Sequence, residues 1–142
     1  FILGTGPELT RLRNKYKINK SKITFLGYLK NNEVCDYYAE AEYFINLSES
    51  EGMSNALIEA MSFGCKCIVS NILENFYTAR NHAIYYEKGE NFSLKIKESL
   101  KLNPKEISNY ANSRFSIDSF ESNQLRELYK IDNNNISCWE RK

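Results

Sequence analysis

Short apolar runs alternate with segments of helical spacing along most of this chain. The apolar runs cover residues 1–3, 23–26, 43–47, 67–69 and 84–86. Helical spacing covers residues 9–16, 34–41, 55–63, 92–100, 105–113 and 120–129. Brief apolar strands separated by helices of about three turns are typical of a parallel sheet with helices on both faces. We therefore predict an α/β fold with a Rossmann-like parallel sheet.

Composition narrows the function classes. The 142 residues are 42% hydrophobic and 26% charged, which is ordinary for one globular domain or most of one. The 19 basic and 18 acidic side chains form no basic block, so nucleic acid is not an expected partner. No apolar run approaches the roughly 20 residues that span a bilayer. Four cysteines and one histidine match no zinc spacing, and no metal site is predicted.

The most polar strand-to-helix junction covers residues 48–54, between the apolar run 43–47 and the helix 55–63. Ligands of open α/β sheets bind at the carboxyl ends of strands. Gly52 allows the backbone to approach a ligand closely. The first amides of the helix, around Ser54, Asn55 and Ala56, have no intrahelical acceptor and can bind phosphate oxygens. The junction therefore predicts a phosphate-binding site.

Two glutamates flank this helix start. Glu59 lies one turn, about 5.4 Å, beyond Asn55, and helical side chains lean toward the N-terminus. Its carboxylate suits the ribose hydroxyls of a nucleotide whose diphosphate binds at the helix start, while Glu51 would face the group beyond the diphosphate. The spacing alone is not specific, because Glu90/Glu98 and Glu98/Glu106 repeat it on solvated helices. An exposed helix residue is therefore the alternative interpretation of Glu59.

The segment 46–64 contains EGMSNALIEAMSFG, a Glu followed after seven residues by a second Glu. This segment resembles the core signature of the family 4 glycosyltransferases. Further stretches are similar to that family in the same order: LGTGP at 3–7, FLGY at 25–28, CIVS at 67–70, and RFS at 114–116 with the helix that follows. The resemblance covers about residues 2–130.

The resemblance implies a GT-B fold, in which residues 1–130 form most of the C-terminal, nucleotide-sugar-binding domain and residues 131–142 a frayed tail. Glu51 would hold the catalytic position, in contact with the donor sugar hydroxyls. Glu59 would bind the ribose. The remaining implied substrate-binding residues are those of the backbone that holds sugar and diphosphate, and two near the base: Gly52, Met53, Ser54, Asn55, Tyr28 and Leu29.

The implied activity is that of a retaining hexosyltransferase in surface polysaccharide biosynthesis. The donor would be a UDP- or GDP-linked sugar, the acceptor a glycan or a lipid-linked glycan, and no metal or other cofactor would be needed. The implied location is cytoplasmic, at the inner face of the membrane, with peripheral membrane contact through an N-terminal domain.

One departure from the family is expected to matter. The family's domain begins with a central strand that ends in a Gly-Arg turn and is followed by a Lys, and these cations clamp the donor diphosphate. Neither feature occurs here, so the chain is interpreted as truncated on its N-terminal side. In the family's strand order 3-2-1-4-5-6, the second and fourth strands would then lack their shared neighbour. Arg11, Arg13 and Lys15 of the first helix are not expected to replace the clamp.

Three alternatives remain to be weighed. A dinucleotide-dependent oxidoreductase would need a third glycine where Leu9 stands and an acidic residue about 20 positions further on. A GT-B-fold sugar-nucleotide epimerase shares the fold, but is not expected to carry the EGxxxxxxEAM run. A non-catalytic remnant that binds nucleotide sugar weakly or not at all would share the ancestry without the activity.

Overall fold

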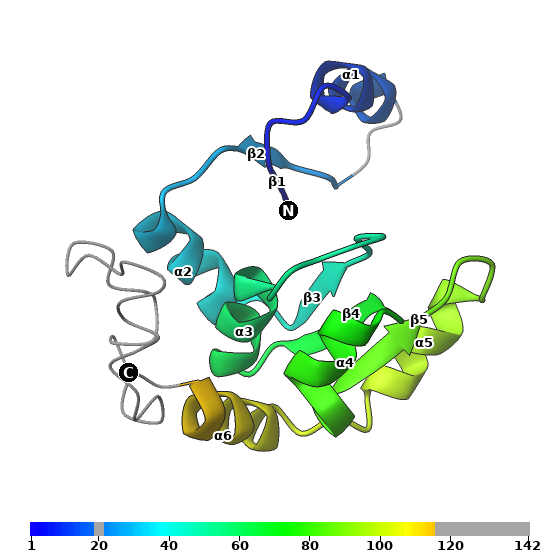
Figure 1. Ribbon diagram of the computed structural model, residues 1–142. Coiled ribbons are helices and arrows are strands. Elements are labelled where there is room, and N and C mark those ends of the chain that lie inside the picture. Colours follow the sequence, from blue (N-terminus) through cyan, green and yellow to red (C-terminus); the bar gives the residue numbers. More distant parts are fainter. Residues whose placement is uncertain (19–21, 116–142) are drawn as a thin grey trace.

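The computed structural model describes residues 1–18 and 22–115. Strands and helices alternate along these ranges (Figure 1). The elements, in chain order, are β1 (Ile2–Leu3), α1 (Leu9–Ile18), β2 (Phe25–Gly27), α2 (Asn31–Glu40), β3 (Tyr43–Asn46), α3 (Asn55–Ser62), β4 (Lys66–Ser70), α4 (Leu73–Ala79), a 3-10 turn (Arg80–His82), β5 (Ala83–Tyr86), α5 (Phe92–Ser99) and α6 (Pro104–Phe115).

The strands form two sheets, and all of their pairs are parallel. One sheet has the order β1-β2 and the other the order β3-β4-β5. In the larger sheet α3 packs against β3 and β4, with α4 and α6 beside it, while α5 contacts β4 and β5. Parallel sheets with helices on both faces confirm the predicted α/β class.

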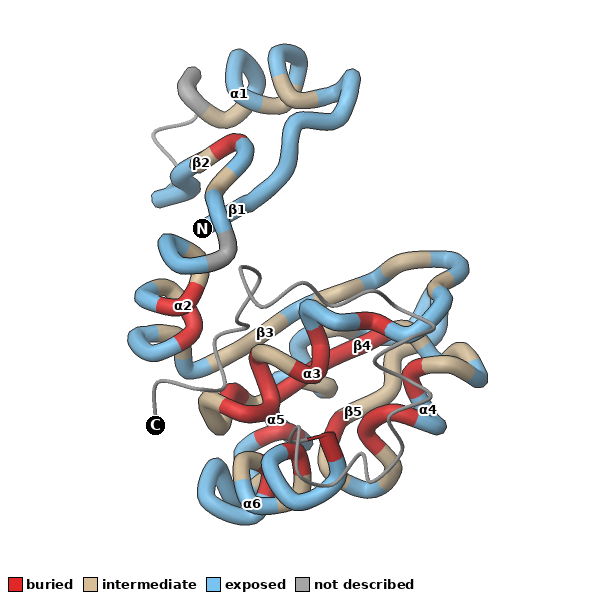
Figure 2. Tube along the Cα trace, turned by 60° about the vertical axis from the view of Figure 1, so that its left-hand side comes forward, coloured by how far each residue is buried: buried red, intermediate tan, exposed pale blue. Residues whose placement is uncertain are grey.

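The core lies around α3 and β4 (Figure 2). Ser54 begins α3, because its hydroxyl accepts a hydrogen bond from the Leu57 amide. The apolar residues of the helix then face the sheet and α6, where Leu57 and Met61 are fully buried. Buried side chains of this size stabilise the fold by about 1.5–3 kcal/mol each. The buried face of α3 therefore holds the first residues of the helix in a defined position.

The smaller sheet lies apart from this body, with α2 between them (Figure 1). Among the described residues, β1 pairs only with β2 and β3 pairs only with β4. Apolar side chains on β1 and β3 are exposed to solvent, including Ile2, Leu3 and Ile45. The Phe1 ring packs edge-on against Tyr37 of α2. The break falls between the two strands that the family order places on either side of its first strand.

Helix α4 has no counterpart among the predicted elements. Its apolar residues Leu73, Phe76 and Tyr77 are exposed, whereas Asn75 and Thr78 are buried. Leu73, Phe76 and Tyr77 nevertheless have the i, i+3, i+4 spacing of a helix, so the sequence carried a signal for α4 that the prediction missed. Other boundaries move by a few residues, with β2 beginning at Phe25 and α6 extending to Phe115.

The described helices have 7 to 12 residues. None of them is long and apolar enough to cross a bilayer. The helix predicted at 120–129 and the tail at 131–142 lie outside the described residues.

Gly64 ends α3 with a φ of 82°. A Cβ atom there would lie 2.9 Å from the Pro104 carbonyl oxygen, at the start of α6. We expect Gly64→Ala to lower the free energy of unfolding by about 3 kcal/mol, from left-handed strain and the clash together. Gly89→Ala is the matched control, because Gly89 has a φ of 104° with open space around it, and strain alone costs about 1 kcal/mol. Equal losses of unfolding free energy for the two variants in urea denaturation would contradict the close contact between Gly64 and Pro104.

Candidate functional site

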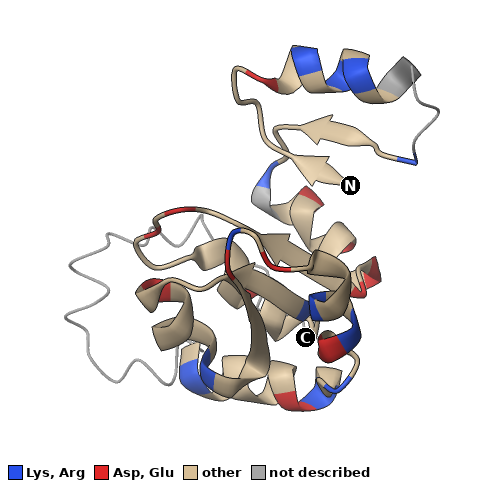
Figure 3. Ribbon diagram, turned by 90° about the vertical axis from the view of Figure 1, so that its right-hand side faces the viewer, with Lys and Arg blue, Asp and Glu red and all other residues tan. Residues whose placement is uncertain are grey.

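The loop from β3 to α3 lies at the carboxyl ends of the strands of the larger sheet. It carries the acidic residues Glu49 and Glu51. Figure 3 shows Lys and Arg in short bands that are scattered over several elements. Arg13 of α1 donates a hydrogen bond to the Phe25 carbonyl oxygen at 3.0 Å. This part of the predicted site is therefore acidic, and Arg13 is engaged within the smaller sheet.

Glu51 is half-buried and held to the end of β3. Its Oε1 accepts a hydrogen bond from the Asn46 Nδ2 at 3.1 Å. The Oδ1 of Asn46 accepts two more, from the amide of Ser48 at 3.1 Å and from its hydroxyl at 2.6 Å. Asn46 thus binds both the beginning of the loop and the carboxylate near its end.

The start of α3 presents an open surface. Ser54 is buried, and its carbonyl oxygen accepts from the amides of Leu57 and Ile58 at 3.1 Å each. Asn55 and Ala56, the first two residues of the helix, are exposed. The amides of a first helical turn have no acceptor within the helix. Gly52 and Met53 are exposed as well, so the backbone predicted to hold sugar and diphosphate is accessible.

Glu59 is half-buried rather than a solvated helix residue. Burial raises the pKa of its carboxyl, and a hydrogen bond from the Tyr38 hydroxyl acts in the opposite direction. Burial, and next the charge of Glu59, raise the pKa of Tyr38 well above its usual value. Tyr38 comes from α2 and packs against Phe44 and Phe63. The sequence indicates a packing role for Tyr38, but not its contact with Glu59, which joins elements distant in sequence.

Tyr28 and Leu29 follow β2, in the smaller sheet. Tyr28 is 77% exposed, and Leu29 is half-buried. Glu51 precedes α3 and Glu59 lies within it, in the larger body, and α2 lies between the two parts (Figure 1). Glu51, Gly52, Met53, Ser54, Asn55 and Glu59 are thus gathered on one loop and helix, while Tyr28 and Leu29 stand on the other part.

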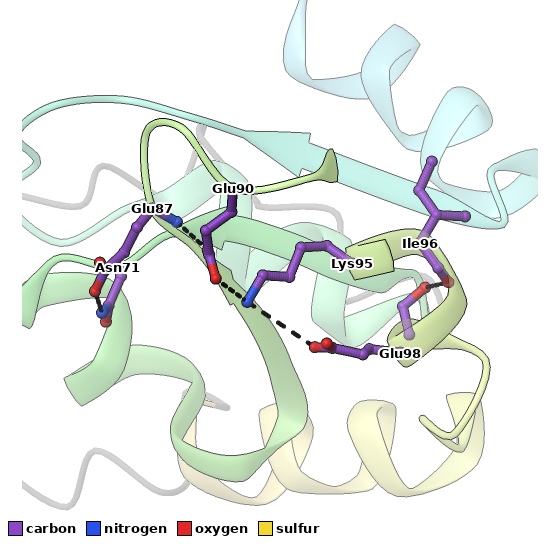
Figure 4. Close-up of polar contacts among 7 residues, drawn as sticks. Asn71, Glu87, Glu90, Lys95, Ile96 and Glu98 are labelled. Carbon is purple, nitrogen blue, oxygen red and sulfur yellow. Dashed lines mark hydrogen bonds and ion pairs between the residues drawn. The ribbon is translucent and has the colours of Figure 1, made fainter. Parts of the chain in front are cut away.

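A cavity of about 400 Å³ opens at the carboxyl ends of β3, β4 and β5. Its lining is formed by residues 47–49, 70–72 and 86–88. At its edge, the Asn71 Nδ2 donates to Glu87 at 2.6 Å, and the Glu87 amide donates to Glu90 at 2.6 Å (Figure 4). Lys95 binds Glu90 at 2.8 Å. None of the predicted site residues lines this cavity, although it includes Ser48 and Glu49 of the same loop.

Comparison with known proteins identifies the family to which the chain is similar. The pattern of the family described as "Glycosyl transferases group 1" matches residues 1–101. The capsular polysaccharide biosynthesis glycosyltransferase CapH of Staphylococcus aureus is 35% identical over 91 residues, which are 64% of this chain and 23% of that protein. The alpha-monoglucosyldiacylglycerol synthase of Acholeplasma laidlawii is 32% identical over 94 residues, 63% of this chain and 23% of the relative.

Two further matches are an enzyme and a solved structure. The UDP-Gal:alpha-D-GlcNAc-diphosphoundecaprenol alpha-1,3-galactosyltransferase of Escherichia coli is 32% identical over 83 residues, 56% of this chain and 21% of that enzyme. A solved structure described as a GtfA/B complex superposes with a TM-score of 0.66 at 20% identity, covering 91% of this chain and 29% of the other. The chain thus spans about a quarter of the length of these proteins.

The raised pKa of Glu59 gives a stability prediction. A carboxyl whose pKa is higher in the folded than in the unfolded state binds more protons when folded, so stability falls as pH rises above the unfolded value of about 4.3. We expect Glu59→Gln to be more stable than the parent at pH 7 and equal to it at pH 3. Thermal unfolding across this pH range measures the difference.

Glu42→Gln is the control of opposite sign. A hydrogen bond from Lys66 lowers the pKa of the exposed Glu42 carboxyl, so this variant loses a small stabilisation at pH 7 that the parent has already lost at pH 3. A Glu59→Gln variant that is less stable than the parent at pH 7 would contradict the account of burial.

Proposed function

The chain belongs to the group 1 glycosyltransferases, and we propose that it forms the part of such an enzyme that binds a nucleotide-sugar donor. The observation that carries the proposal is the placement of two half-buried carboxylates around one open helix start. Glu51 precedes α3 on the loop, Glu59 lies one turn into the helix, and the exposed Asn55 stands between them. Diphosphate, sugar and ribose each meet a group of suitable chemistry along this line.

Each part of the donor is assigned to particular atoms. The diphosphate oxygens accept from the outward amides at Asn55 and Ala56, where the helix dipole favours negative charge. The Glu51 carboxylate accepts from hydroxyls of the donor sugar, with Gly52 allowing close approach of the backbone. The Glu59 carboxylate, ionised above its raised pKa, accepts from the ribose hydroxyls. Tyr28 and Leu29 are assigned to the base.

The finer features of the reaction follow from the family resemblance. Transfer proceeds with retention of configuration from a UDP- or GDP-linked hexose to a glycan or lipid-linked acceptor. The start of α3 stabilises the leaving diphosphate, without a metal ion. The names of the relatives include capsular polysaccharide synthesis, a diacylglycerol glycolipid and a diphosphoundecaprenol-linked sugar, which supports such acceptors in surface polysaccharide assembly at the inner face of a membrane. Transfer itself belongs to the whole protein.

The test is a calorimetric titration of the chain with UDP, GDP and their glucose, galactose and mannose conjugates. We expect saturable binding of one nucleotide and its conjugate. Glu59→Ala should weaken that binding at least tenfold, because a charge-assisted hydrogen bond contributes about 1.5–3 kcal/mol. Glu98→Ala is the matched control, since Glu98 is an exposed carboxylate at the end of α5.

Two results would overturn the proposal. A cooperatively folded parent that binds none of these compounds would favour the non-catalytic remnant. Equal affinities for the parent and Glu59→Ala would remove Glu59 from the donor site.

A further inference from the structure

A series of hydrogen-bonded residues connects the body of the larger sheet to the carboxylate of Glu51. The Asn75 Nδ2 donates to the Ser70 Oγ at 3.1 Å, and the Ser70 hydroxyl donates to the Ser48 carbonyl oxygen at 2.5 Å. The Ser48 hydroxyl donates to the Asn46 Oδ1 at 2.6 Å, and the Asn46 Nδ2 donates to Glu51 at 3.1 Å. All four bonds point toward Glu51, and they pass through two different groups of Ser48, whose carbonyl oxygen accepts from Ser70 while its hydroxyl donates to Asn46. We refer to these five residues as the Glu51 relay.

The far end of the relay is rigid. Asn75 is fully buried in α4, and its Nδ2 also donates to the Ser70 carbonyl oxygen at 3.0 Å. Ser70 is the last residue of β4, one position beyond the Val69 that pairs with Asn46. The sheet register therefore fixes the distance between Ser70 and the loop that begins after β3. The core therefore holds in place the backbone positions that the relay joins.

The near end of the relay controls a side chain that otherwise has freedom. Glu51 is only half-buried on an irregular loop, and a free Glu side chain loses rotamer entropy when it is ordered. The Ser48 hydroxyl that donates to the Asn46 Oδ1 polarises the side-chain amide, which strengthens its Nδ2 as a donor to Glu51. Only one oxygen of Glu51 is used by Asn46 in the described contacts. The other can accept from a ligand while the first remains held.

We propose that Asn46 is a positioning residue for Glu51, and that the Glu51 relay fixes the carboxylate in the orientation that recognises hydroxyls of the donor sugar. This inference rests on the proposed function, because Glu51 is the group assigned to the sugar. Asn46 touches no ligand itself. It acts by ordering Glu51 before the ligand arrives, so its loss affects the sugar part of the donor and not the nucleotide part.

The two ends of the Asn46 amide can be separated by substitution. Asn46→Asp keeps an oxygen that accepts from Ser48 and loses the Nδ2 that donates to Glu51. Asn46→Ala loses both. A role in the loop turn alone predicts harm only from Asn46→Ala, whereas a positioning role for Glu51 predicts harm from both variants. Asn109→Ala, at an exposed position of α6, is the matched control for removal of an asparagine.

The binding experiment compares two affinities for each variant, one for UDP or GDP and one for the corresponding sugar conjugate. The ratio of conjugate affinity to nucleotide affinity cancels general losses of folding. We expect this ratio to fall about tenfold in both Asn46 variants, which is the scale of one hydrogen bond to a charged group. In both, the affinity for the free nucleotide should stay within about twofold of the parent. An unchanged ratio in Asn46→Asp would overturn the positioning role.

A second measurement needs no ligand. The side-chain amide signals of Asn46 in a ¹⁵N NMR spectrum should shift in Glu51→Gln, which changes the acceptor of the Nδ2, and stay in place in Glu49→Gln, whose carboxylate is exposed. Signals of Asn46 that respond equally to both variants would overturn the Glu51 relay. A parent that binds no nucleotide but shows the selective shift would defeat the proposed function, and with it the role in sugar recognition, while leaving the relay as a structural contact.

Discussion

The parallel pairing of β3 with β4 is the interaction on which the rest of the site depends. Its register sets Asn46 opposite Val69, so that Ser70 lies beside the loop that follows β3. The same pair supports α3, whose Leu57 and Met61 are fully buried. A shift of one residue would send the side chains of β3 to the opposite face of the sheet. The pairing of β3 with β4 therefore sets the positions of the loop, of the start of α3 and of both glutamates.

The site also keeps a carboxylate where solvation is poor. Glu59 is half-buried against α2, which disfavours its charge, and the Tyr38 hydroxyl compensates for only part of that. Retention of a charged group in such surroundings is typical of positions that bind or react rather than stabilise. The stability of α3 is thus partly given up to place an acceptor beside an open helix start.

The sequence was sufficient to predict the strands, α3 and the loop that carries Glu51, because apolar spacing and a polar junction are local properties. The prediction missed α4, although Leu73, Phe76 and Tyr77 have helical spacing there. The Glu51 relay and the Tyr38–Glu59 contact were out of reach, since both join residues whose proximity depends on strand register and helix packing. The break between β1 and β3 was expected only from the family's strand order. The roles of individual residues toward a ligand remain predictions.

The most direct test of a donor site at α3 is the pattern of amide shifts in ¹⁵N NMR spectra when a UDP- or GDP-sugar is added to the chain. The account predicts the largest changes at residues 51–59, with the Asn55 and Ala56 amides moving most as they bind the diphosphate. Changes centred instead on residues 70–72 and 86–88, which line the neighbouring cavity, would contradict it.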